Sequence, residues 1–553
     1  MKVFFGENMS HNLYLYPGTQ KEAPDCVNAA PHGMNSHKAF CNVKRNRNAY
    51  SMNRKQLFLT ALACIALASC TDNIRESGPT EPKSEYNIFV MSDIHVMAPE
   101  LLVEKGSAFE NYVKTDPKLL EESGEVLRAV VDVVLEKKPD LVLIPGDLTK
   151  DGEMVSHQLV VSLLKPIRTA GIPVVVIPGN HDIDNPEGVY YQGGQTRPAE
   201  RTSTQQFTQL YADYGYARPE TVRDPASLSY TCEPLEGLVL ICLDSNLYEE
   251  NLFVERGAST NYNQTAGRIR EATLEWMWQQ ADAARAAGKQ VVAMMHHNAI
   301  AHYDGQATLQ SPYVVRDYKP LAEGMMQHGI HLVFTGHQHL QDIAQYRTAT
   351  EDKVDCLTDI STGATVSYPN VWRTITVGRD FTRWDVSTGY IKSIPSIADV
   401  QQECYKRSST NIADGLLWHI NEYWPTIESF SGVSSALLPP TPEETTALLM
   451  DCLGKPFVEA YMIHNAGNEN DNPRSQAVIA EFEEGVRQLC RQLIKGRVKE
   501  AELDSMAGFL KTMLMQFIKP TLTSMLTDTN QAGDAALSSR TDDLQVLLTI
   551  PHP

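Results

Sequence analysis

Six short apolar runs, each followed at once by polar residues, constrain the fold of this chain more than any other feature. They are NIFVM, LVLIP, PVVVIP, LVLICL, QVVAMM and HLVFT, and all lie between residues 87 and 335. Runs of this length that are rich in Val and Ile predict buried strands. Between the first two runs, Leu119–Leu135 repeats Leu and Val every three or four residues, as an amphipathic helix does. The alternation predicts an α/β domain over residues 85–394.

The polar residues after the runs form the ordered clusters SDIH, GDLT, GNHD, DSN, HHN and GHQH. Ligands bind at the carboxyl ends of strands in α/β sheets, so we expect these clusters to lie close together. A single histidine at a strand end is usually structural. Here, however, six of the thirteen histidines after Cys70 fall in the clusters, and this order favours a shared metal site.

The clusters contain residue types that suit metal-dependent hydrolysis. Asp93 and His95 are two apart, so an extended strand would direct both side chains to one side. Asp147 follows a glycine, and its carboxylate has two oxygens that can bridge two cations. Asn180 offers a neutral amide oxygen, and the adjacent His181 can donate a proton. The remaining candidates of this kind are His296, His297, His337 and His339.

The ordered set D-x-H, G-D, G-N-H-D, H and G-H-x-H resembles the calcineurin-like metallophosphoesterase superfamily over roughly residues 87–340. The strings SDIHV, IPGDLTKDGE, IPGNHDI, MMHHN and FTGHQHLQDI are most similar to bacterial enzymes related to cyclic nucleotide phosphodiesterases, some of which have a helical C-terminal domain. The resemblance implies a sandwich of two sheets flanked by helices, with two adjacent metal ions at the strand ends. One departure from the family's pattern is Asn298, since many relatives have Pro shortly after the histidine that corresponds to His296. The departure concerns the shape of the loop after His296, not the ligands.

The resemblance also implies a ligand set. By the match to the family's motifs, one metal ion would be bound by Asp93, His95, Asp147 and His339, and the other by Asp147, Asn180, His296 and His337. Imidazole, carboxylate and amide ligands without thiolates suit two divalent or mixed-valence ions of Mn, Fe or Zn. The six cysteines after Cys70 lack CxxC spacing, which argues against a thiolate cluster. Two ions roughly 3.5–4 Å apart hold a bridging hydroxide that attacks the phosphate ester.

One further residue near these motifs receives a catalytic role, and four receive supporting roles. His181 is the candidate catalytic acid, and Asp182 is expected to orient it. His297 follows the family's ligand position and is expected to support the site or contact substrate. We expect Asp244 to hold a loop rather than a metal ion, and His302 to lie in a loop that meets either substrate or solvent.

The predicted reaction is hydrolysis of a phosphate ester, with a small diester such as a cyclic nucleotide as the first interpretation. A phosphomonoesterase or a pyrophosphohydrolase would use the same metal ions, so the sequence leaves these alternatives open. A non-catalytic surface lipoprotein is a third alternative, against which the complete set of motif ligands argues. The formal net charge of −20 repels polyanions and argues against long nucleic acids as partners.

A basic and then apolar segment near the N-terminus predicts export. Arg54 and Lys55 precede Leu57–Ser69, whose thirteen residues are too few for a membrane span of ~20 residues. The residues LASC resemble a lipobox, which implies a lipidated Cys70; a plain signal peptide with an incidental cysteine is the alternative. We expect a mis-assigned upstream extension over residues 1–51, a lipoprotein signal peptide over 52–70 and a flexible tether over 71–84. The protein would then be exported and lipid-anchored to the cell envelope, in the periplasm or at the outer surface.

After about residue 394 the strand-like runs give way to long helical patterns. They predict an all-helical C-terminal domain over residues 395–553, with a capping box and proline at Thr441–Glu444 and a later helix at Ser475–Lys495. This part of the sequence has no cluster of metal-ligand residues, so we expect it to support the first domain or to control substrate access. The sequence does not define its precise role or the oligomeric state.

Overall fold

The computed structural model describes residues 83–253, 262–349, 354–422, 442–494, 514–527 and 541–552. The predicted upstream extension, the signal peptide with Cys70 and most of the tether lie outside these ranges. Within the described ranges, no helix combines the length and the apolar character needed to cross a membrane.

The first of two large sheets contains β1 (Glu85–Val90), β3 (Leu141–Ile144), β4 (Val174–Val176), β14 (Val371–Gly378), β15 (Arg383–Tyr390), β16 (Thr541–Asp542) and β17 (Gln545–Thr549). Its strand order is β16-β17-β15-β14-β1-β3-β4. β1 and β3 are parallel, with Ile88 opposite Leu141, and β3 and β4 are also parallel. Because these three strands run in one direction, the loops after them meet at one edge of the sheet.

The second large sheet contains β7 (Val222–Arg223), β8 (Tyr230–Leu235), β9 (Leu238–Leu243), β10 (Gln290–Met295), β11 (Leu332–Thr335), β12 (Ile343–Ala349) and β13 (Val354–Ser361). Its order is β12-β13-β11-β10-β9-β8-β7. The four central strands, β13, β11, β10 and β9, are parallel to one another. Every residue of β10 is buried, as a strand covered on both faces requires. A small third sheet joins β2 (Leu102–Glu104), β5 (Val189–Gln192) and β6 (Gln195–Pro198).

The two large sheets pack face to face. One hydrophobic cluster contains Phe89 and Val142 of the first sheet together with Leu240, Val292 and Phe334 of the second. Apolar side chains of both inner faces therefore share one core, and the predicted two-sheet sandwich is confirmed.

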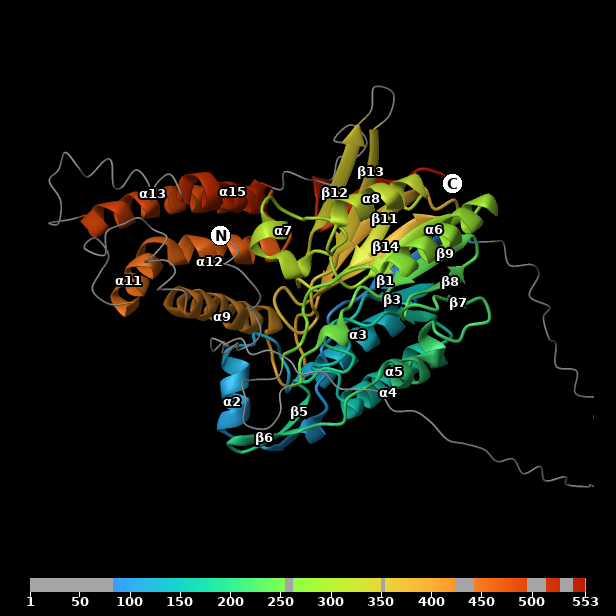
Figure 1. The fold of residues 1–553 in the computed structure, drawn as a ribbon, viewed down its shortest axis with the longest axis horizontal. Coiled ribbons are helices and arrows are strands. Elements are labelled where there is room, and N and C mark those ends of the chain that lie inside the picture. Colours follow the sequence, from blue (N-terminus) through green and yellow to red (C-terminus); the bar gives the residue numbers. More distant parts are fainter. Residues whose placement is uncertain are drawn as a thin grey trace, which may run out of the picture. The chain divides into compact units, whose positions relative to one another are not determined.

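Helices cover the outer faces of the sandwich (Figure 1). The described helices before residue 394 are α2 (Ser107–Lys114), α3 (Ser123–Lys137), α4 (Met154–Thr169), α5 (Thr204–Leu210), α6 (Glu271–Ala286), α7 (Gln306–Leu309) and α8 (Tyr318–Gln327). Among them, α2 packs on the small third sheet, with Phe109 against Tyr191. Short 3₁₀ turns lie at Pro99–Leu101, Ala212–Tyr214, Tyr248–Glu250 and Ser311–Tyr313. α3 and α4 pack on the first sheet through Val130 and Leu164, whereas α6 and α8 pack on the second through Met277 and Met325.

The helical C-terminal region that the sequence predicts is confirmed. It contains α9 (Val400–Glu422), α11 (Pro442–Leu449), α12 (Lys455–Asn465), α13 (Ser475–Ile494) and α15 (Lys519–Thr527), with π-helical turns at Met450–Gly454 and Leu514–Ile518. Their apolar faces form a separate hydrophobic cluster around Phe482, Leu489 and Met525. Thr441, the first residue of the predicted capping box, lies outside the described residues.

The end of the chain differs from the all-helical prediction, because β16 and β17 follow the last described helix. β17 pairs antiparallel with β15, with Val546 opposite Val386. The helical region is therefore inserted between strands of one sheet. The strand QVLLT buries alternate residues, but five residues are too few for that period to stand out in the sequence.

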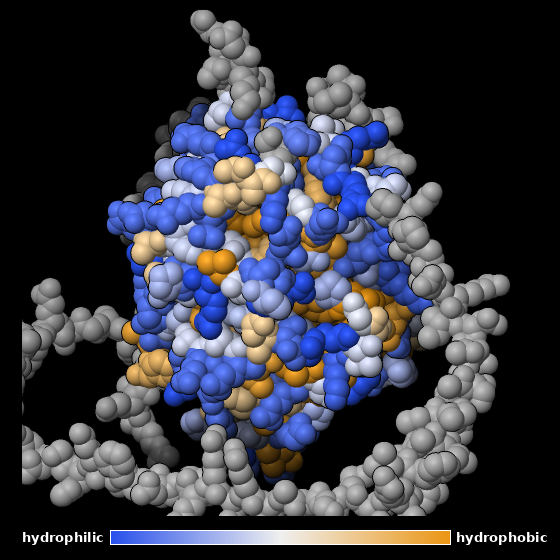
Figure 2. Space-filling view, turned by 90° about the vertical axis from the view of Figure 1, so that its right-hand side faces the viewer, coloured by the Kyte–Doolittle hydropathy of each residue, from blue (hydrophilic) through white to orange (hydrophobic). Residues whose placement is uncertain are grey.

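The molecular surface is mostly polar on the face that one view shows. The face in Figure 2 is largely hydrophilic, with apolar side chains in scattered patches. The large exposed apolar side chains among the described residues are Val103, Val222, Leu252, Phe253 and Tyr405. Scattered single apolar residues are usual on soluble surfaces and mark no site by themselves.

Candidate metal centre

The structure brings the seven predicted metal ligands together from loops after five strands. β1, β3 and β4 of the first sheet and β10 and β11 of the second precede these loops. Potential ligand atoms lie within 4.8 Å of one another in three overlapping groups: Asp93, His95 and His339; His95, Asp147 and His181; and Asp147, His296 and His337. The seventh residue, Asn180, contacts His296.

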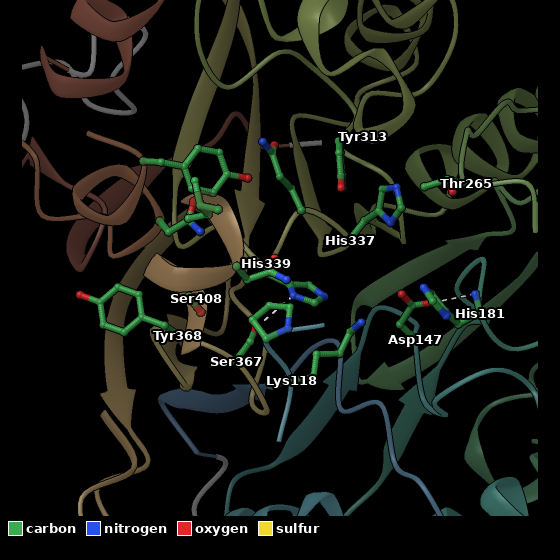
Figure 3. A pocket seen from close by; sticks show the side chains of 16 residues that line it. Lys118, Asp147, His181, Thr265, Tyr313, His337, His339, Ser367, Tyr368 and Ser408 are labelled. Atoms are coloured by element: carbon green, nitrogen blue, oxygen red, sulfur yellow. Dashed lines mark hydrogen bonds between the residues drawn. The ribbon is translucent and has the colours of Figure 1, made fainter. Parts of the chain in front are cut away.

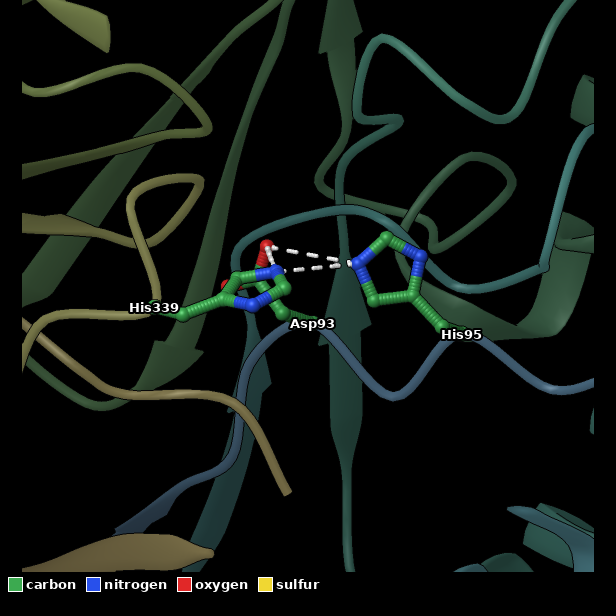
Figure 4. A group of neighbouring side chains, drawn as sticks. All are labelled: Asp93, His95 and His339. Carbon is green, nitrogen blue, oxygen red and sulfur yellow. Dashed lines mark hydrogen bonds and ion pairs between the residues drawn. The ribbon is translucent and has the colours of Figure 1, made fainter. Parts of the chain in front are cut away.

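The side chains of the first group, two imidazoles and a carboxylate, converge on one point (Figure 4). His95 Nε2 lies 3.1 Å from His339 Nε2. His339 Nε2 is 3.5 Å from Asp93 Oδ1, and Asp93 and His95 are fully buried. Nitrogen and oxygen lone pairs that converge in a buried site form a suitable environment for a cation.

The third group, Asp147, His296 and His337, meets the first group at Asp147. Asp147 Oδ2 is 3.3 Å from His296 Nε2 and 3.5 Å from His95 Nε2, so one carboxylate oxygen faces both groups. His296 Nε2 is also 3.1 Å from Asn180 Oδ1. The buried His337 Nε2 has no hydrogen-bond partner among the described residues. An unpartnered buried nitrogen beside a carboxylate is the environment that a metal ion would complete.

Five of the ligand candidates have a left-handed backbone, which is uncommon for residues other than glycine. They are Asp93, His95, Asp147, His337 and His339, with φ between 36° and 71°. Each such residue costs on the order of 1–3 kcal/mol, and this strain persists mainly at functional sites.

The backbone of Asp93 and His95 corrects the argument from strand periodicity. β1 ends at Val90, and both residues lie beyond it in a turned loop rather than on an extended strand. Their side chains converge because the backbone turns at each of them. Gly146, in contrast, has φ +99°, and a Cβ there would lie 2.6 Å from His296 Nδ1, so the close approach before Asp147 requires glycine.

Burial and charge act in opposite directions on these side chains. Burial lowers the pKa values of His95 and His337 well below the usual range, which leaves these imidazoles neutral and able to bind a metal ion. Burial opposes ionisation of Asp147, but His296, His181 and His95 hold its pKa well below the usual value. The pKa of His296 rises to about 9 because Asp147 outweighs burial, so metal binding there must displace a proton.

His181 is oriented by Asp151 rather than by the predicted Asp182. Its Nδ1 donates a hydrogen bond to the Lys150 carbonyl at 2.8 Å and lies 2.9 Å from Asp151 Oδ1. Burial lowers the pKa of His181, but Asp147 and Asp151 raise it to about 9. The Asp182 carboxylate instead accepts hydrogen bonds from backbone N–H groups of Leu148, Thr149 and Gly179. It fixes the two loops that carry Asp147 and Asn180.

The three other predicted residues hold loops around the centre. Asp244 accepts hydrogen bonds from the backbone of Leu228 and Asn246 and from the Tyr248 hydroxyl. His297 Nε2 donates to the Thr265 carbonyl at 2.9 Å, and its Nδ1 lies 2.7 Å from Ser245 Oγ. His302 lies between Asp342 Oδ2 at 2.8 Å and Asp359 Oδ2 at 3.2 Å, so it is a buried ion-pair residue rather than a solvated loop residue.

The comparisons with known proteins agree with this geometry. The family model described as calcineurin-like phosphoesterase matches residues 86–341. These residues form a calcineurin-like phosphoesterase domain. The family uses a dinuclear metal centre, and all seven predicted metal ligands lie within the matched residues.

One curated relative is a probable cyclic nucleotide phosphodiesterase from Ruthia magnifica subsp. Calyptogena magnifica, 37% identical over 59 residues. The match covers 11% of this chain and 24% of that protein, so the chain spans about a quarter of the relative's length. A solved dimetal phosphatase from Danio rerio is 12% identical, with a TM-score of 0.38 over 55% of this chain and 96% of the other. A phosphopantetheinyl hydrolase from Mycobacterium tuberculosis is 11% identical, with a TM-score of 0.23 over 51% and 90%.

A cavity of about 90 Å³ opens beside the candidate metal centre (Figure 3). Its floor, by which we mean the side of the predicted metal ligands and the predicted acid, consists of Asp147, His181, His337 and His339. Its roof consists of residues from α9 and α12, namely Ser408, Asn411, Ile412, Tyr461 and Asn465. Lys118 also lines the cavity.

Sequence reasoning missed several of these residues. Asp151 lies four positions after Asp147 in GDLTKDGE, so its place in a recognised motif string was an available signal. Lys118 and the roof residues carry no such signal, because they lie outside the strand-end clusters and approach the centre only through the tertiary fold.

Proposed function

We propose that the chain hydrolyses a small phosphodiester with the help of two divalent metal ions. The observation that carries this proposal is the position of Asp147, whose Oδ2 faces a histidine of each ligand group. One ion would be held by Asp93, His95, Asp147 and His339, and the other by Asp147, Asn180, His296 and His337. Nitrogen and oxygen donors without thiolates fit Mn, Fe or Zn. The bound ions would supply an activated water nucleophile and positive charge against the phosphate oxygens.

The protein's own contribution to bond cleavage would come from His181. Its Nδ1 is engaged by Asp151 and by the Lys150 carbonyl, so proton donation to the leaving oxygen falls to Nε2. The two acceptors at Nδ1 favour a protonated ring, which is the form that a general acid requires. Asp151 is thus a positioning residue for the proposed acid.

Two observations favour a small substrate. The cavity beside the candidate metal centre has a volume of about 90 Å³, several times the ~10–15 Å³ that a single water needs. That volume suits a phosphoryl group with a short part of its ester rather than a long polymer. The short similarity to a probable cyclic nucleotide phosphodiesterase supports a diester, although a phosphomonoesterase or pyrophosphohydrolase would use the same residues.

A direct test compares substrates on purified protein of residues 71–553. We expect two equivalents of bound metal and faster hydrolysis of aryl phosphodiesters and cyclic nucleotides than of aryl monoesters. Chelation of the metal should abolish both activities, and adding back Mn, Fe or Zn separately would identify the active ion. A clear preference for monoesters would contradict the diesterase proposal while leaving the phosphoester hydrolase assignment intact.

We also propose that the enzyme is exported and lipid-anchored through Cys70. The support is the basic, apolar and LASC order of residues 54–70. Labelled fatty acid should enter the protein in cells, and Cys70→Ala should abolish the label. Equal labelling of the variant would exclude Cys70 as the lipid attachment site.

A further inference from the structure

Lys118 brings an ammonium group to the cavity beside the metal centre. It lies in the segment between α2 and α3 and is only 3% exposed. Among the described residues that line the cavity, it is the only Lys or Arg. Figure 3 shows its side chain directed toward the space between His339 and Asp147. A cation in this position faces the place where the phosphate of the proposed substrate would bind.

The Lys118 segment is held firmly in place. The two oxygens of Asp116 accept hydrogen bonds from the backbone N–H of Lys118 at 2.9 Å and from its Nζ at 2.8 Å. The next residue, Leu119, donates its N–H to the Val366 carbonyl at 2.8 Å. Val366 precedes Ser367, whose Oγ lies 3.0 Å from His339 Nδ1. The lysine and one predicted metal ligand are therefore supported by the same loop.

The ammonium can contact more than its counter-ion. It has three N–H donors, and among the described residues Asp116 is its one hydrogen-bond acceptor. A buried ion pair is often no more stable than apolar side chains of similar volume, so packing alone does not explain a lysine here.

We propose that Lys118 binds a non-bridging oxygen of the substrate phosphate and thereby sets the affinity of the enzyme for phosphoryl groups. This inference rests on the proposed function, since the same centre must hold the phosphate. A lysine acts on phosphate as a point charge, so the contact strengthens with the negative charge of the ligand. Dianionic inorganic phosphate and monoesters therefore depend on Lys118 more than monoanionic diesters do.

The test measures binding of inorganic phosphate to the metal-loaded protein by calorimetry, and its inhibition of aryl diester hydrolysis. Lys118→Met should weaken phosphate binding by about 10- to 100-fold, the usual value of a charge-assisted hydrogen bond, while metal content stays the same. KM for the diester should rise with a smaller change in kcat. Lys118→Arg should restore most of the affinity. The matched control is Lys105→Met, because Lys105 pairs with Glu121 on the exposed surface and should have no effect.

Asp116→Asn separates substrate binding from a purely structural ion pair. If Lys118 binds phosphate, Asp116→Asn keeps or increases the phosphate affinity because the ammonium loses its competing counter-ion. Equal loss of affinity and of thermal stability in Lys118→Met and Asp116→Asn would overturn the inference, as would unchanged phosphate binding in Lys118→Met. If the wild-type protein binds phosphate through Lys118 yet cleaves neither diesters nor monoesters, the proposed function fails while this binding role stands.

Discussion

The floor and the roof of the cavity differ in how their side chains are held. The floor residues Asp147, His337 and His339 lie in loops after strands and have left-handed backbones. The roof residues lie on regular turns of α9 and α12. Strained backbone positions tolerate little change, whereas the roof residues have ordinary helical backbones. Asn411 is half-buried, and the other four roof residues are buried. From this comparison we propose that the floor carries the reaction and that the roof influences which substrate is bound.

We expect the largest effect on metal content and turnover from Asp147→Asn in the floor. The substitution preserves shape but removes the charge that faces both ligand groups. Bound metal should fall below two equivalents, and turnover should drop by more than the ~10²–10³-fold typical of one electrostatic group. Metal analysis and kcat measurement check this. Asp282→Asn is a suitable control because Asp282 is a surface residue paired with His328. Full metal content with normal turnover would exclude a bridging role.

His181→Ala should separate proton transfer from metal binding within the floor. Both metal ions should remain, and turnover on esters of poor leaving groups should fall on the order of 10²–10⁴-fold. The loss should shrink for good leaving groups, because an alcohol that departs readily as an anion needs little protonation. A leaving-group series with metal analysis checks both points. An equal loss across the series, or an emptied metal site, would refute the general-acid role.

The candidate metal centre, which includes the floor, was largely predictable from the sequence, because its residues lie in motifs at the ends of strands. Asp93, His95 and Asn180 were identified by type and order, and the fold brings them together at the meeting edge of two sheets. The local reasoning was less accurate, since Asp93 and His95 converge through a turned backbone that strand periodicity does not encode. Adjacency in the sequence suggests Asp182 as the residue that orients His181, whereas in the fold His181 contacts Asp151.

The roof could not be predicted for a physical reason. Helical periodicity shows that α9 and α12 have apolar faces, but it does not show which other element those faces meet. Asn411 and Tyr461 reach the cavity only because the helical region is inserted between β15 and β17 of the first sheet. The short strand β17, which closes that insertion, also lacks a sequence signal of its own.

A smaller effect is expected from Asn411→Ala, which tests whether the roof influences substrate selectivity. Removing one amide should change the ratio of kcat/KM values between cyclic nucleotides and aryl diesters by about 2- to 10-fold, the value of a neutral hydrogen bond of ~0.5–1.5 kcal/mol. Metal content and the leaving-group dependence should stay the same. Lys406→Ala on the same helix is the control, because Lys406 is exposed. Equal scaling of all substrates would show that Asn411 does not influence selectivity.

The smallest effect on turnover is expected at His302, which supports the loop between floor and roof. Its partner Asp342 lies between two residues that connect this loop to other parts of the fold. The N–H of Gln341 donates to the Asn465 carbonyl at 3.2 Å, and the N–H of Ile343 donates to the Asp543 carboxylate at 2.7 Å. Burial lowers the pKa of His302, but Asp359 and Asp342 raise it to about 10. The unfolded value is ~6.5, so the folded state retains the proton at higher pH.

It follows that the stabilisation from protonated His302 is complete below pH ~6.5 and is lost as the pH rises toward about 10. The free energy of unfolding in urea should therefore decline over this interval in the wild-type protein, and less steeply in His302→Gln. The variant should also be less stable by about 3–5 kcal/mol at pH 7, because two buried carboxylates lose their cation. Its kcat and metal content at moderate temperature should be close to those of the wild type. If His302→Gln instead lost metal or changed the leaving-group dependence, the loop between floor and roof would belong to the catalytic centre itself.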